Sequence, residues 1–402
     1  FSLLGNFYKV FGSHYLSDRF FTLILFAFLV VLIYAVIKLL KVKKLHSFLL
    51  TVFFLVAIPV FCWSYVNQVI EPLVNCLIAL TILLFLKFIS NKKKIYVLWY
   101  SLCIFLLFLS KGFQSCFIAL LPVFYYLLAG LNKRVLYFTL SSSVFLLGLI
   151  YFTIKIYPPG TIWFNCYYES RLLLTMQNIG RTTDYHLEIV FRFFTELLVC
   201  LLFLLSIIGF VSYKKKYPVK LVLKNFASNR LAFSLLLVSL VGSFPFAISL
   251  VQRGFYLVPS FICFVLSIVA GFKRYWIFLY AFLAQLARLK VTRILVPTCA
   301  LFSLAFTVVQ INNYKRDQLL LQDIDHILPF LQEGDTVLIS GDLWNYFNLH
   351  SYLYMRKKIN LSAEKINAKF LLLDKKASSA TFIKSYSEVN IKTEEINLLK
   401  AN

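Results

Sequence analysis

A single glutamate, Glu71, interrupts the long apolar first part of the chain. It lies in a six-residue hinge, residues 67–72 (NQVIEP), and Asp18 is the only other carboxylate among the first 168 residues. A carboxylate in or at the edge of a membrane is costly and usually faces a cavity, a partner or the interface. Glu71 is therefore the first candidate for acid–base chemistry. The structural alternative is that Pro72 begins a helix and Glu71 caps it at the water interface.

Two short connections between apolar runs each place a cation directly before a glycine. Lys111 lies in Ser-Lys-Gly at residues 110–112, and Arg253 lies in Gln-Arg-Gly-Phe-Tyr at residues 252–256. Lysine and arginine are the charge-assisted donors that bind phosphate oxygens. Either sequence could instead end a helix, with the glycine in the left-handed conformation and the cation near the negative helix end. The two cations thus suggest an anion site and leave the structural alternative open.

Composition assigns these residues to a membrane protein. The 402 residues are 60% hydrophobic and 18% aromatic, and a soluble domain is only about 45–50% apolar. Apolar runs of about 20 residues, the length that crosses a bilayer, recur along the chain. We expect an all-α polytopic membrane protein with about ten transmembrane helices. They lie at about 21–40, 46–66, 72–89, 95–109, 115–131, 135–155, 193–212, 231–250, 255–272 and 294–311. The shorter run 276–287 predicts an interfacial helix.

The connections between these spans alternate in charge. One side carries 21 Lys and Arg residues and no acid, which by the positive-inside rule is the cytoplasmic side. The net charge of +24 is therefore explained by membrane loops and indicates no nucleic-acid partner. All six acids of the membrane region fall on the opposite side, with Lys111, Arg253 and the long connection 156–192. Its Asp184, His186 and Glu188 form no metal motif, so we expect no metal site.

The chain changes character after residue 311. Residues 317–332 have helical spacing, 336–340 resemble a strand, a second helix is expected from Asp342 past Tyr354, and 369–373 resemble another strand. The sequence thus predicts a transmembrane domain at 1–311 and a small extracytoplasmic α/β domain at 312–402. The α/β domain contains no GxGxxG or P-loop sequence, and we expect it to be non-catalytic.

The order of these short motifs resembles a known family. The motifs are Leu4-Gly5 followed by Asp18-Arg19, Glu71-Pro72, Leu109-Ser110-Lys111-Gly112, and Gln252-Arg253-Gly254-Phe255-Tyr256 with Pro259. Over about residues 1–272, in order and on matching sides, they resemble the membrane glycosyltransferases of the GT-C fold. Within that fold the chain is most similar to the protein O-mannosyltransferase and lipid A aminoarabinose transferase group.

The resemblance implies an enzyme that transfers a sugar from a polyprenyl-phosphate donor to an envelope lipid, glycan or protein at the outer face of a bacterial inner membrane. No nucleotide or other cofactor is implied. By position, Glu71 matches a second carboxylate of the family's site, and Lys111 and Arg253 match cations at the donor phosphate. Asp18, Arg19 and Tyr256 match substrate-binding positions. The family's principal catalytic carboxylate lies in a loop that, on this alignment, precedes Phe1.

Three other functions remain open on the sequence alone. An O-antigen ligase or polymerase would depend on arginines of the long outer connection, such as Arg171 or Arg181. A transporter or flippase would place ionisable residues near mid-membrane, often in inverted repeats, whereas the charges here lie at span ends. A structural membrane scaffold would need none of these residues.

Overall fold

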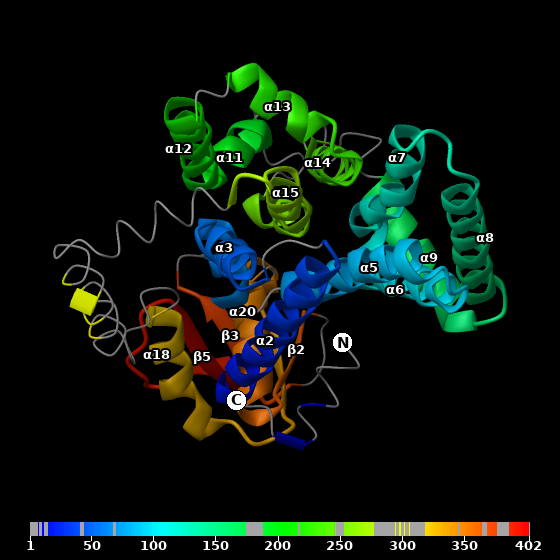
Figure 1. The fold of residues 1–402 in the computed structure, drawn as a ribbon. Helices are drawn as coiled ribbons and strands as arrows, with labels where there is room; N and C mark the ends of the chain where they lie inside the picture. The colour runs from blue at the N-terminus through cyan, green and yellow to red at the C-terminus, as the bar shows by residue number, and fades with distance from the viewer. Residues whose placement is uncertain are drawn as a thin grey trace. The chain divides into compact units, whose positions relative to one another are not determined.

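The computed structural model describes residues 15–40, 44–66, 70–173, 188–215, 218–244, 253–276, 318–344, 346–363, 368–375 and 386–401, with a few single positions elsewhere. The chain separates into two compact units. One comprises residues 19–287, and the other comprises residues 1–18 and 288–402. The first unit is helical, and the second contains the sheet (Figure 1).

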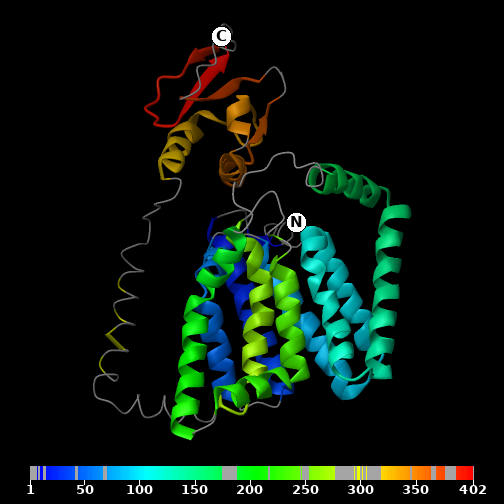
Figure 2. The ribbon, with the colours of Figure 1, turned by 90° about the horizontal axis from the view of Figure 1, so that it is seen from above.

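The long helices of the larger unit lie side by side as a bundle (Figure 2). Its first half contains α2 (Tyr15–Leu39, shared with the other unit), α3 (Lys44–Val56), α4 (Pro59–Val66), α5 (Glu71–Asn91), α6 (Ile95–Lys111), η1 (Gly112–Leu120), α7 (Leu121–Leu128) and α8 (Lys133–Lys155). Its second half contains α9 (Pro158–Tyr167), η2 (Tyr168–Leu173), α11 (Glu188–Glu196), α12 (Leu198–Lys215), α13 (Val219–Ala227), α14 (Arg230–Ser243), η4 (Gly254–Leu257) and α15 (Val258–Gly271).

Five helical runs in the described part of the chain are long and apolar enough to cross a membrane: Arg19–Leu39, Glu71–Asn91, Ile95–Leu128, Lys133–Lys155 and Gly254–Gly271. Two bent pairs, α11 with α12 and α13 with α14, raise the number to seven if each pair is one span. The predicted membrane character is confirmed, whereas the predicted count of ten spans is not. The predicted span 294–311 and the interfacial helix 276–287 lie almost entirely outside the described residues.

The run Ile95–Leu128 contains two of the predicted spans, because the chain reverses at Gly112. This glycine has φ +73°, a value that favours residues without a Cβ. The Ser115 hydroxyl then donates to the Leu107 carbonyl (2.6 Å), and the Tyr100 hydroxyl donates to the Ile118 carbonyl (3.1 Å). Residues after the turn therefore run back along α6, and Lys111 lies at the tip of this hairpin.

The predicted span 46–66 is divided into α3 and α4, because Pro59 lacks a backbone donor and begins a new helix. The backbone N–H of Val60 donates to Glu196 Oε2 at 2.8 Å, across 136 residues of sequence. The first N–H groups of a helix have no partner within the helix, and this carboxylate supplies one for α4. Glu196 thus has a structural role in α4.

Helix α15 forms the centre of the larger unit. All 14 of its residues are buried, and it packs against α3, α5 and α14. Small polar side chains line its contact with α14: the Ser243 and Ser260 hydroxyls are 2.6 Å apart, and the Ser267 hydroxyl donates to the Ala232 carbonyl. Such residues let helix backbones approach closely in membrane proteins.

Gly242 of α14 lies against the Phe117 ring, and we expect Gly242→Ala to destabilise the protein by about 1–3 kcal/mol through overpacking. A Cβ at this position would lie 2.7 Å from the ring. Gly148→Ala in α8 is the matched control, since a Cβ there meets nothing within 4 Å and alanine has the higher helix propensity. Thermal unfolding in detergent would distinguish the variants, and equal melting temperatures would contradict the expected contact.

The smaller unit contains a mixed five-stranded sheet of order β2-β1-β3-β5-β4. The strands are β1 (Thr336–Ile339), β2 (Asn360–Ser362), β3 (Phe370–Asp374), β4 (Tyr386–Glu388) and β5 (Ile396–Ala401), and the helices are α18 (Gln318–Ile327), α19 (Gly341–Trp344) and α20 (Phe347–Lys357), with the short η5 (Leu328–Phe330). β1 pairs in parallel with β2 and β3, whereas β5 is antiparallel to β3 and β4. The α/β character predicted for the tail is therefore observed.

Asp323 of α18 fixes the start of β5, and we expect Asp323→Asn to weaken that attachment by about 3 kcal/mol. Its buried carboxylate accepts hydrogen bonds from the backbone N–H groups of Glu394 (2.7 Å), Glu395 (2.6 Å) and Ile396 (3.0 Å). The side-chain amide of the Asp323→Asn variant would turn its NH2 group, itself a donor, toward backbone N–H groups that need an acceptor. Hydrogen exchange of these three amides in the full-length protein should accelerate about 100-fold.

Glu333→Gln is the control for this variant, because it removes an exposed ion pair instead of a buried carboxylate. The hydrogen bond from Lys358, together with its charge, lowers the pKa of Glu333. The small stabilisation from Glu333 is therefore present above its unfolded pKa and is lost as the pH falls through its lowered folded pKa. We expect Glu333→Gln to leave the exchange of β5 unchanged at neutral pH. Unchanged exchange in Asp323→Asn as well would contradict the assigned role.

Candidate active site

Glu71 is the first residue of α5 and is 1% exposed. The residue in the capping position is Ile70, and no side chain caps this helix start. The structural alternative of a glutamate capping the helix at the water interface is therefore wrong. Its carboxylate is turned to a cation of another helix, because burial of an ionised group requires a partner of opposite charge.

That cation is Lys111, the last residue of α6. Its Nζ lies 2.5 Å from Glu71 Oε1, and the two side chains are 9% and 1% exposed respectively. The helix ends here because Gly112 adopts positive φ, and α5 and α6 pack against each other along their lengths. The structure thus joins two of the predicted site residues in one buried, hydrogen-bonded ion pair.

Two aromatic rings of η4 lie beside the ammonium group of this pair. The distance from Lys111 Nζ is 5.2 Å to the ring centroid of Tyr256 and 5.9 Å to that of Phe255. Both distances are within the range of cation–π attraction. Arg253 Cζ lies 6.0 Å from the Phe255 centroid, and the Arg253 side chain is exposed. Lys111, Tyr256 and Arg253 are therefore brought together around Phe255.

Four buried polar atoms near the start of α5 and in α4 make no hydrogen bond of normal geometry to the described residues: Glu71 Oε2, Asn75 Oδ1, Asn75 Nδ2 and the Tyr65 hydroxyl. The Tyr65 hydroxyl nevertheless lies near enough to the Asn75 side chain to interact with it. Asn75 is fully buried and follows Glu71 by four residues, which places both on one face of α5. Buried polar groups are normally paired, because an unmade hydrogen bond is costly. These atoms can accept and donate hydrogen bonds to a hydroxylated ligand.

Sequence reasoning missed Asn75 and Tyr65. The sequence signal that could have identified Asn75 is its position one helical turn after Glu71, inside an otherwise apolar run. It also missed Arg192, whose guanidinium occupies the space that a side chain on Gly254 would take: an ideal Cβ on Gly254 would lie 2.3 Å from Arg192 Nε. Arg192 Nε is also 4.0 Å from Glu196 Oε1. Arg192 thus packs against Gly254, the residue that follows Arg253, and is a third cation of this region.

The remaining predicted residues are not placed at this site. Asp18 and Arg19 are in α2, where Arg19 is partly buried and the side chain of Asp18 lies outside the described part of the chain. Arg171 is in η2 with its side chain likewise not described, and Arg181 lies outside the described residues. Within the described residues, no group of His, Cys, Asp and Glu could hold a metal ion.

The chain matches no protein-family model, no curated protein and no solved structure.

Proposed function

We propose that this protein is an integral-membrane glycosyltransferase that moves a sugar from a polyprenyl-phosphate donor to a lipid, glycan or protein acceptor of the cell envelope. The observation that carries the proposal is the buried pair of Glu71 and Lys111. It leaves Glu71 Oε2 without a partner among the described residues and holds the ammonium group beside Tyr256. A carboxylate beside a fixed cation suits transfer of a sugar from a phosphate leaving group to a hydroxyl.

Glu71 serves the acceptor in this proposal. Its Oε2 accepts a hydrogen bond from the acceptor hydroxyl and takes the proton as the hydroxyl oxygen bonds to the anomeric carbon. The bond from that carbon to the phosphate oxygen breaks at the same time, and the polyprenyl phosphate leaves with the electron pair. The ion pair fixes the direction of the carboxylate, and such positioning reduces the entropic part of the barrier.

The cations serve the phosphate. Lys111 has three N–H donors and uses one on Glu71, which leaves two for a phosphate oxygen. Arg253 is exposed beside the same Phe255 ring, and its planar guanidinium suits two oxygens of one phosphate. Both charges stabilise the leaving group without supplying a proton.

We expect Arg253→Gln to raise the KM for the lipid-linked donor by about 10–100-fold, the loss of one charge-assisted hydrogen bond. Transfer from a labelled polyprenyl-phosphate sugar in proteoliposomes measures this. Lys133→Gln, which removes an exposed cation of α8, is the control and should leave KM unchanged. Wild-type rates in variants of Glu71, Lys111 and Arg253 alike would contradict the proposed site.

The same proteoliposomes test the alternative functions. Movement of the lipid-linked sugar between leaflets without transfer would favour a transporter over the proposed enzyme. Loss of activity in Arg171→Gln with retention in Glu71→Gln would favour a ligase or polymerase.

A further inference from the structure

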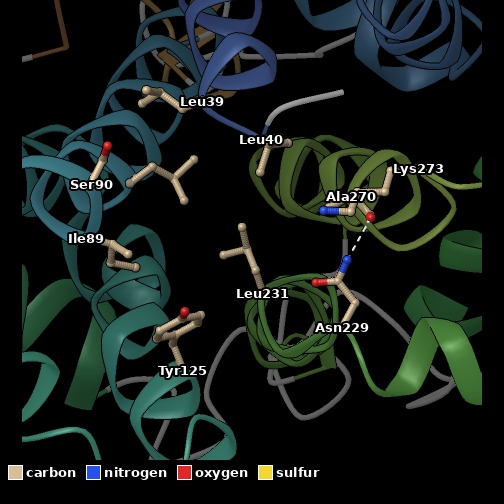
Figure 3. Close-up of a pocket in the computed structure, with 10 residues that line it drawn as sticks. Leu39, Leu40, Ile89, Ser90, Tyr125, Asn229, Leu231, Ala270 and Lys273 are labelled. Atoms are coloured by element: carbon tan, nitrogen blue, oxygen red, sulfur yellow. Dashed lines mark hydrogen bonds between the residues drawn. The ribbon is translucent and has the colours of Figure 1, made fainter. Parts of the chain in front are cut away.

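A second site lies at the other end of the larger unit. A cavity of about 340 Å³ is lined by Leu39 of α2, Ile89 and Ser90 of α5, Tyr125 of α7, Leu231 of α14 and Lys273 after α15 (Figure 3). Ile89 follows Glu71 by 18 residues on the same helix, which is about 27 Å at 1.5 Å per residue. The cavity is therefore separate from the candidate active site.

The wall formed by α14 and α15 is fixed by Asn229. Its side-chain oxygen accepts from the N–H of Ala232 (3.3 Å) and caps α14, and its Nδ2 donates to the Ala270 carbonyl (2.8 Å; Figure 3). Arg230 donates to the carbonyl of Ala129, just beyond α7 (3.1 Å). These bonds tie the start of α14 to the ends of α15 and α7, which are the helix ends around the cavity.

The lining combines an apolar interior with a charged rim. Leu39, Ile89 and Leu231 face the space together with Tyr125, whereas Ser90 and Lys273 are exposed at its edge (Figure 3). Pockets of about 300–1,000 Å³ with mostly apolar walls and a few polar groups are typical of ligand sites. An occupant must therefore carry both an aliphatic part and a polar part that accepts hydrogen bonds.

The positive charge around the cavity favours an anionic ligand. The sequence contains no Asp or Glu from residue 72 to 168 or from 197 to 316, whereas Lys273 and Arg274 follow α15, Lys92 to Lys94 follow α5, and Arg230 begins α14. The protein thus supplies no carboxylate within these segments to balance Lys273. Basic pockets between transmembrane helices bind anionic lipid headgroups.

We propose that this cavity binds one molecule of an anionic glycerophospholipid. The first part of one acyl chain lies among Leu39, Ile89 and Leu231, and the phosphate is bound by Lys273 at the rim. The cavity is too small for two chains, so the rest of the lipid extends into the bilayer. This site is independent of the proposed glycosyl transfer.

The probe for this site is phosphatidylglycerol with palmitoyl and oleoyl chains, titrated onto the purified full-length protein and followed by native mass spectrometry. We expect one tightly bound molecule, with phosphatidylcholine of the same chains binding at least fivefold more weakly. Lys273→Gln should weaken phosphatidylglycerol binding about fivefold, the usual contribution of one basic residue, and Lys273→Arg should retain it. Leu231→Trp, which fills the space, should abolish binding of that one lipid.

The matched control is Lys133→Gln, an equal loss of charge at an exposed position that does not line the cavity. Its affinity should stay within twofold of the wild type. Equal losses in the Lys133 and Lys273 variants would show general surface attraction and overturn the site, as would equal binding of both lipids. Since Lys273 is exposed, its variants are expected to fold even if Leu231→Trp does not.

Discussion

Lys111→Met is expected to destabilise the protein by about 3–5 kcal/mol, because it leaves the buried carboxylate of Glu71 without its partner. The lysine is 9% exposed and the glutamate 1% exposed, so water cannot replace the lost ammonium group. Reversible unfolding in mixed detergent micelles would measure the change. Lys358→Met removes the cation of an exposed ion pair in the smaller unit and should have a far smaller effect, because exposed ion pairs contribute little to stability.

The double variant Glu71→Leu with Lys111→Met separates pairing from packing. Replacement of both members of a buried ion pair by apolar residues is often neutral or stabilising, so we expect its stability to return to within about 1–2 kcal/mol of the wild type. A loss equal to the sum of the two single variants would show that the groups do not interact. The result bears on stability alone and holds whatever reaction the protein catalyses.

Glu71→Gln is expected to lower kcat/KM for sugar transfer by about 100-fold or more, because the amide keeps the shape of the side chain and cannot take a proton. The measurement is transfer from the lipid-linked donor, with rates normalised to the folded fraction. The stable double variant should be equally inactive. Glu71→Asp retains a carboxylate and should recover part of the activity.

Comparison of Asn75→Leu with Glu71→Gln distinguishes a residue that binds the acceptor substrate from one that removes its proton. Asn75→Leu removes two buried polar atoms that make no hydrogen bond of normal geometry to the described residues and have only the nearby Tyr65 hydroxyl to interact with, so the loss of stability should be small. If Asn75 binds a hydroxyl of the substrate, KM rises while kcat changes less than in Glu71→Gln. Activity of Glu71→Gln within a few fold of the wild type would exclude Glu71 from the chemistry.

Charge patterning was sufficient to select three residues of the candidate site, Glu71, Lys111 and Arg253, although not its other members. The distribution of Lys and Arg assigned Glu71, Lys111 and Arg253 to one face of the membrane, and in the structure Lys111 contacts Glu71 and lies with Arg253 around Phe255. Residues assigned to the same side of the membrane all lie at one end of the helix bundle. The few charged side chains at that end are therefore expected to lie close together. Their chemical roles remain predictions.

Contacts between distant segments could not be predicted in this way. The division at Pro59 is accompanied by a hydrogen bond to Glu196, 136 residues after Val60, and the place of Arg192 depends on the missing side chain of Gly254. Asn75 resembled an ordinary polar residue in an apolar run until its burial was known. In each case the deciding contact involves tertiary packing, about which periodicity and propensity carry no information.

The ion pair joins the first residue of α5 to the last residue of α6, two antiparallel neighbours of 21 and 17 residues. Its formation therefore depends on the lengths of both helices. One residue inserted between Ile95 and Lys111 would rotate the ammonium group by about 100° around the helix axis and advance it about 1.5 Å. Insertions and deletions inside these two helices should consequently be tolerated far less well than in the lysine-rich turn that connects them.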